Sequence, residues 1–162
     1  MKAFCSRACL AALITLGLSV PAVQAAEDAP GFVRIPLEET PWKDLPGYPG
    51  VRIAVMAGDP SKEGLYIVRI NFPPGVMSRP HFHPDDRYGV VLKGTWWTGT
   101  GEEFKPETTV PVKPGGFMKH PAGGHHYDGA KDEEVILQLV GYGPTKTTLL
   151  HPEDGHTGRS LK

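Results

Sequence analysis

The sequence has almost no cysteine. Its two cysteines, Cys5 and Cys9, lie inside the opening segment MKAFCSRACLAALITLGLSVPAVQA. Two cations, an apolar run and small residues that suit signal peptidase make this segment typical of a secretory signal peptide, so we predict a signal peptide at 1–25 with cleavage after Ala25. The remaining chain has no cysteine, which excludes disulfides. We therefore expect it to depend on a packed core, helped by a metal or a partner subunit.

Long apolar runs and basic clusters are absent as well. The run from about Ala8 to Val20 is shorter than the roughly 18 to 20 residues of a membrane-spanning helix, and it ends in a proline. We expect a periplasmic or secreted protein with no stable membrane anchor after cleavage. Cleavage leaves 137 of 162 residues, with 15 of the 17 lysines and arginines against 18 acids. This slightly acidic balance makes nucleic acid an unsuitable partner.

No window has the apolar period of a confident helix, because 20 glycines and 17 prolines divide the chain into short segments. Short segments between turn residues, at a spacing of roughly 8 to 12 residues, predict an all-β sandwich or barrel. The expected strands are Val51 to Met56, Leu65 to Phe72, Tyr88 to Lys93, Thr95 to Gly99, Gly116 to His120, Val135 to Tyr142 and Lys146 to Leu150.

The chain is expected to form one domain over 51–150. The proline-rich segment 26–50 is predicted to be an irregular arm that wraps the barrel or exchanges with a partner subunit, which favours a homodimer. The polar segment 151–162 is predicted to be a tail whose end is disordered.

Two histidines one residue apart stand out in the stretch PGVMSRPHFHPDDRYGVVLKG, which covers 74–94. Side chains two apart on a strand share a face, so His81 and His83 can offer their imidazoles to one centre. A second stretch, PGGFMKHPAGGHH at 114–126, ends in His126. His125 beside it would point to the opposite face, and it could compete if the strand has a bulge.

These two stretches resemble the two conserved motifs of the cupin superfamily, over roughly Leu65 to Leu150. The first motif is matched at Gly75, His81, His83 and Gly94, and the second at Pro121, Gly123 and His126. The resemblance implies an all-β jelly-roll barrel, a double-stranded β-helix. It also implies a metal site at His81, His83 and His126 for a divalent transition metal such as iron, manganese, zinc or nickel. His120 and Asp128 are interpreted as residues that support the site.

The departure from the motif is Arg87, which stands where cupins have a glutamate ligand. An arginine stays protonated and has no lone pair for a metal. Three alternatives remain open. Arg87 can pair with Asp85 or Asp86 and leave a three-histidine site, one of these aspartates can become the carboxylate ligand, or Arg87 and the histidines can form an anion pocket without metal.

The resemblance implies a small-molecule site more strongly than a reaction, because this fold hosts many activities. The first hypothesis is an exported enzyme of oxygenase, isomerase or lyase type, in which Arg87 is catalytic and contacts an anionic substrate. The second is an exported module that binds or senses a metal or a small molecule without turnover.

Overall fold

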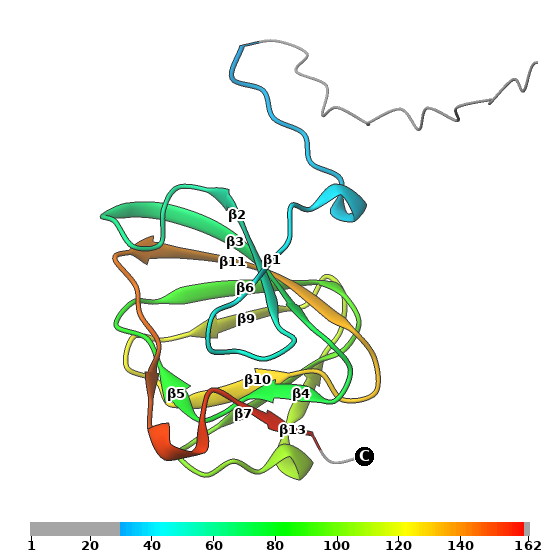
Figure 1. The fold of residues 1–162 in the computed structure, drawn as a ribbon, viewed down its shortest axis with the longest axis vertical. Helices are drawn as coiled ribbons and strands as arrows, with labels where there is room; N and C mark the ends of the chain where they lie inside the picture. The colour runs from blue at the N-terminus through cyan, green and yellow to red at the C-terminus, as the bar shows by residue number, and fades with distance from the viewer. Residues whose placement is uncertain (1–29, 161–162) are drawn as a thin grey trace, which may run out of the picture. The chain divides into compact units, whose positions relative to one another are not determined.

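The computed structural model describes residues 30–160, which are almost entirely β structure (Figure 1). The described residues from Glu39 onward form one compact unit, which holds all the β structure of the described part of the chain. The predicted signal peptide lies outside the described residues. No helix within 30–160 is long and apolar enough to cross a membrane.

One sheet has six antiparallel strands and carries most of the core. Its order is β1 (Lys43–Asp44), β2 (Arg52–Ala57), β3 (Gly64–Phe72), β11 (Val135–Gly143), β6 (Arg87–Lys93) and β9 (Phe117–His120). The two longest strands, β3 and β11, lie at its centre and pair over nine residues from Gly64 to Phe72. This sheet occupies the upper part of the β structure in Figure 1.

The second sheet is built around β10 (His126–Gly129), which pairs with three other strands. Along the main path the order is β12 (Thr148–Leu149), β5 (His81–Phe82), β10, β4 (Val76–Ser78) and β13 (Thr157–Arg159). Off this path, β7 (Trp96–Thr100) pairs with both β10 and β8 (Val110–Val112). Three short 3-10 helices complete the described elements: η1 (Leu37–Glu39), η2 (Pro106–Thr108) and η3 (Pro152–Asp154).

The core follows from alternation along β3 and β11. Tyr66 and Val68 on β3, and Leu137 on β11, are almost fully buried, whereas Leu65 is half exposed. Alternate side chains of a strand point to opposite faces, so this pattern turns one face of the sheet inward. Trp96 joins the same core from β7 with only 1 % of its surface exposed. Two antiparallel sheets packed around one core confirm the predicted all-β jelly-roll class.

The seven expected strands all have counterparts, with ends shifted by one or two residues. Six strands, each only two to four residues long, are not among the expected ones: β1, β4, β5, β8, β10 and β13. The largest difference is in the tail, whose end was expected to be disordered. There Thr157–Arg159 pairs with Val76–Ser78, and the Ser160 N–H donates to the Gly75 carbonyl. Backbone hydrogen bonds hold this polar segment in place, although it has few apolar side chains to bury.

Gly94, predicted from the sequence to be the glycine of the first cupin motif, has a structural reason to be glycine. It joins β6 to β7 with φ of +72°, in the left-handed region. A Cβ added there would lie 2.1 Å from the Glu134 carbonyl oxygen. The tight connection places Arg87 and Trp96 on neighbouring segments around the site.

Candidate metal centre and cavity

The three histidines predicted from the sequence lie together. His81 on β5 and His126 on β10 are direct partners in the sheet, and His83 follows β5 immediately. The ring centroids are 4.3 Å apart for His81 and His126, and 5.4 Å apart for His83 and His126. One donor nitrogen from each of the three lies within 4.8 Å of the others, and all three side chains are buried.

A backbone carbonyl sets the tautomer of each histidine. The Nδ1 to carbonyl oxygen distances are 2.7 Å from His81 to Arg79, 2.9 Å from His83 to Lys146, and 2.8 Å from His126 to Gly124. Because a carbonyl can only accept, each Nδ1 carries the proton and each Nε2 keeps its lone pair. Metal-binding histidines are held in this way in many sites, so the arrangement fits a metal ion.

Burial also keeps the imidazoles neutral. Desolvation is the main cause that lowers the pKa of His81 to about 3, and repulsion between protonated His81 and His126 adds to it. Desolvation lowers the pKa of His83 as well, with Arg87 as the second cause, and desolvation lowers that of His126. At neutral pH these rings therefore hold no extra proton that a metal would have to displace.

Arg87 lies inside the cluster and does not fold away from it. It begins β6, and its Nη1 donates to the Nε2 of His83 at 2.6 Å. The guanidinium thus uses the lone pair with which His83 would bind a metal. His83 can join a metal site only when this hydrogen bond is broken.

Neither aspartate of the HPDDR stretch replaces the missing glutamate. Asp85 accepts hydrogen bonds from Tyr66 and Thr145. Asp86 accepts from the Ala122 N–H at 2.8 Å and forms an ion pair with Lys119 at 2.6 Å. In the described part of the chain neither carboxylate belongs to a group with the histidines or pairs with Arg87. Two of the three alternatives for Arg87 therefore need correction, since the aspartates are occupied elsewhere.

A second group of possible ligands shares His126 with the first. It contains His120, the last residue of β9, and Asp128, which stands two residues after His126 on the same face of β10. Asp128 Oδ2 lies 3.8 Å from His120 Nε2 and 3.9 Å from His126 Nε2. His120 was expected only to support the site. The register of β9 against β6, which places His120 opposite Arg87, brings it inward and is not visible in a single sequence.

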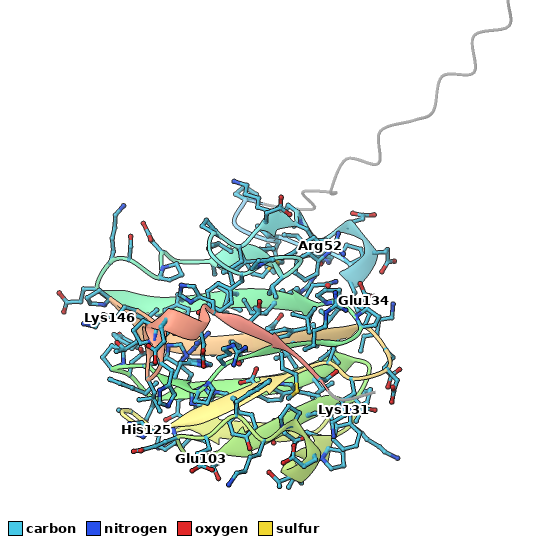
Figure 2. The ribbon with its side chains drawn as sticks, turned by 60° about the horizontal axis from the view of Figure 1, so that its bottom comes forward. Arg52, Glu103, His125, Lys131, Glu134 and Lys146 are labelled. Atoms are coloured by element: carbon cyan, nitrogen blue, oxygen red, sulfur yellow. The ribbon has the colours of Figure 1, made fainter. Side chains whose placement is uncertain are left out.

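His125 lies outside both groups. Its Nδ1 is 3.2 Å from Glu102 Oε1, and the side chain is about one third exposed. Figure 2 shows His125 at the periphery, in the region where Glu103 is also labelled. Strand alternation thus separates it from His126, and the strand has no bulge there.

The cluster faces a cavity of about 210 Å³. Histidines 81, 83, 120 and 126, with Arg87 and Asp128, form its polar side. Mainly apolar side chains from β3 and β11 also line it: Tyr66, Val68, Ile70, Phe72, Leu137 and Leu139. A cavity with apolar walls and a few convergent polar groups is typical of a small-molecule site.

No family model matches the chain, and no curated protein matches it. Solved structures do match. The polyketide cyclase RemF from Streptomyces resistomycificus superposes with a TM-score of 0.57 at 17% identity, over 73% of this chain and 86% of that one. A cupin-like protein from Thermotoga maritima gives 0.55 at 18% identity, over 71% and 89%. The DMSP lyase DddQ from Ruegeria pomeroyi DSS-3 gives 0.58 at 18% identity, over 70% of this chain and 62% of that longer one.

Proposed function

Since the chain has the fold of the cupin superfamily, we propose that it is a metal-dependent enzyme that converts a small molecule bearing an anionic oxygen. The observation that carries this function is the convergence of buried Nε2 lone pairs on one side of the cavity. The matched cyclase and lyase support small-molecule chemistry on this fold, and oxygenation, isomerisation and elimination are the candidate reaction types.

The predicted ligand group of His81, His83 and His126 offers one way to hold the ion, provided that Arg87 leaves His83. His126 is common to both ligand groups, so the function depends on it most. A divalent transition metal would polarise a substrate oxygen or activate dioxygen there. Iron, manganese, zinc and nickel all accept such donors.

Arg87 is suited to bind the anionic part of the substrate. Its side chain lines the cavity, and its Nε is buried without a hydrogen-bond partner among residues 30–160. A buried N–H without a partner costs about 1 to 3 kcal/mol, and a carboxylate oxygen of a bound molecule would remove that cost. A planar guanidinium can also hold a carboxylate through two parallel bonds.

The apolar side chains that line the cavity would bind the rest of the substrate. Side chains such as Val68 and Leu139 would contact an apolar body and exclude water from it. Exclusion of water strengthens the attraction between Arg87 and the anion, because the local dielectric falls. The expected substrate is therefore a small carboxylate or enolisable compound with an apolar part.

The test combines metal analysis with a search for turnover. The purified mature protein without a histidine tag is assayed for transition metals, beside His126→Gln and the neighbouring His125→Gln as a matched control. We expect bound metal in the wild type and in His125→Gln, and its loss in His126→Gln. Less than about a tenth of an equivalent in the wild type, unchanged in His126→Gln, contradicts a metal-dependent function and favours the anion pocket.

Turnover separates an enzyme from the alternative, a module that only binds. The metal-loaded protein is incubated with a panel of small apolar carboxylates, and products are followed by mass spectrometry. Conversion that His126→Gln abolishes and His125→Gln retains supports an enzyme. Saturable binding of a panel member without conversion supports the non-catalytic module instead.

We also propose export and a homodimer. The N-terminal segment supports cleavage after Ala25, which N-terminal sequencing of the secreted protein would detect. The outer face of the six-stranded sheet exposes large apolar side chains, among them Tyr88, Phe117 and Tyr142, and this supports self-association. Light scattering of the mature protein would give the mass of a dimer.

A further inference from the structure

The Asp128 carboxylate is buried in the cavity without an ion pair to a lysine or arginine of the described residues. Only 6 % of the residue is exposed, and it lies on the polar side of the cavity beside two histidines. Within 30–160 no lysine or arginine forms an ion pair with it, and its nearest basic atoms are the Nε2 atoms of His120 and His126. Burial raises the pKa of the Asp128 carboxyl, while His126, Trp96 and Arg87 act in the opposite direction. Removing a carboxylate from water is costly unless a cation compensates for it.

His120 and His126 beside it also have buried polar atoms without partners within residues 30–160. The Nε2 of each is buried and has no hydrogen-bond partner among the described residues. In His126 the carbonyl of Gly124 holds the proton on Nδ1, so its Nε2 is a free lone pair. Two nitrogens without partners and one carboxylate oxygen, from β9 and β10, therefore lie within 4.8 Å of one another.

The separations fit a single small cation. Zinc binds histidine nitrogen and carboxylate oxygen at about 2.0 to 2.2 Å, which places tetrahedral ligand atoms roughly 3.4 Å apart. Here Asp128 Oδ2 lies 3.8 Å from one Nε2 and 3.9 Å from the other. Coordination would shorten these separations by about 0.4 to 0.5 Å, and it would also require a turn of the His120 or His126 ring, whose centroids lie 3.7 Å apart at 32°. The carboxylate is also anchored through its backbone, because the Asp128 N–H donates to Ser78 Oγ and Ser78 Oγ–H donates to the Asp128 carbonyl.

We propose that His120, His126 and Asp128 are the metal-binding group of this chain, and that Asp128 supplies the carboxylate that position 87 lacks. This choice of ligands rests on the proposed function, since it needs a metal in the cluster. Arg87 remains on His83 in this arrangement and keeps its cation towards the cavity. The negative ligand, Asp128, thus lies on β10, and the substrate-binding cation, Arg87, lies on β6. Arg87 occupies the position at which the usual cupin motif has its glutamate ligand.

The experiment is a metal titration of the full mature protein. The metal-free protein is titrated with Zn²⁺ against a chromophoric chelator, and separately with Co²⁺, whose absorption spectrum reports its ligands. The variants are Asp128→Asn and His120→Gln, which remove members of the group, and His83→Gln, which removes the sequence-predicted ligand. His125→Gln is the control, because it changes an exposed histidine beside His126.

We expect Asp128→Asn and His120→Gln to weaken Zn²⁺ binding by ten-fold or more and to change the Co²⁺ spectrum. His83→Gln should stay within about three-fold of the wild type, as should His125→Gln. Asp128→Glu keeps a carboxylate, so it should recover part of the affinity and serves as the test if Asp128→Asn does not fold.

Two results would overturn this ligand group while the metal-dependent function survives. One is a loss of ten-fold or more in His83→Gln, whatever the other variants do. The other is wild-type affinity in both Asp128→Asn and His120→Gln. A wild-type protein that binds neither ion at micromolar concentration refutes both the ligand group and the proposed function.

Discussion

Replacing Arg87 should strengthen metal binding, because the arginine competes with the metal for His83. In the structure the guanidinium donates to the Nε2 of His83 at 2.6 Å, within a buried cluster. A hydrogen bond that involves a charged group contributes about 1.5 to 3 kcal/mol. Removing it in Arg87→Met frees the Nε2 of His83, a third nitrogen near His126, and it also removes a positive charge that repels the ion.

The expected gain follows from that energy. At about 1.4 kcal/mol for each ten-fold change, release of His83 corresponds to roughly ten-fold to a hundred-fold tighter Zn²⁺ binding in Arg87→Met. Arg87→Glu should gain more, because it restores an anionic ligand at the position where cupins have one. Zn²⁺ competition against a chromophoric chelator measures both.

Two further variants identify the cause of the gain. Arg87→Met combined with His83→Gln should lose most of it, whereas His83→Gln alone should change little, so the two substitutions should be non-additive. Arg52→Met is the matched control. Arg52 lies on β2 and pairs with Glu134 at 3.5 Å, and both are labelled on the outside of the molecule in Figure 2. Affinity in Arg87→Met that equals or falls below that of the wild type would refute the competition and make the arginine part of the metal site's architecture.

Three other outcomes are expected. Gly94→Ala should lower the free energy of unfolding, measured by urea denaturation, by several kcal/mol, because its Cβ would meet a backbone oxygen at 2.1 Å. Gly115 has a similar φ of +81° but open space around it, so Gly115→Ala should lower this free energy by only about 1 kcal/mol. Hydrogen bonds from Lys93 and Asn71 lower the pKa of Glu134, so the stability that this carboxylate contributes is present above the unfolded-state pKa near 4.5 and is lost as the pH falls. Glu134→Gln should therefore lower the free energy of unfolding by up to about 1 kcal/mol at pH 7 and not at all near pH 2. An equal cost at both pH values would contradict this. Zn²⁺ at 100 times its Kd should add about 2.7 kcal/mol to the stability and raise Tm by roughly 10 °C in calorimetry, an increase that a chelator reverses.

The sequence predicts the architecture well because alternation and turn residues are local signals. β3 and β11 were both expected within a residue of their observed ends, since each is rich in apolar and β-branched residues and has glycine or proline at a boundary. That His81, His83 and His126 lie together could also be predicted, because His81 and His83 are two residues apart and the second matched stretch ends in His126. The short strands at the edges of the sheets could not be predicted, because two or three residues are too few to show an alternation of apolar and polar side chains.

The charged part of the site depends on register, which one sequence does not contain. Asp128 looks like a turn residue beside Gly129, yet β10 continues through both and pairs Asp128 with Thr98. His120 precedes a proline and faces inward only because β9 pairs with β6 there. The target of Arg87 was equally hidden, because two nearby aspartates in the chain looked like better partners than a histidine. The pairings of β9 with β6 and of β10 with β7 join strands that are far apart in sequence, whereas Arg87 and His83 are only four residues apart.

The pairing of β13 with β4 affects when the site can be assembled. Asp128 is fastened to β4 through Ser78, and β4 is held on its other edge by Thr157–Arg159, about eighty residues later in the chain. A polypeptide that emerges from a ribosome one residue at a time can pair β3 with β11 once residue 143 is free. It cannot secure the strand that positions Asp128 until residue 159 is free. The ligand group should therefore mature last, and proteolysis that removes only the final strand should cost metal affinity before it costs the barrel.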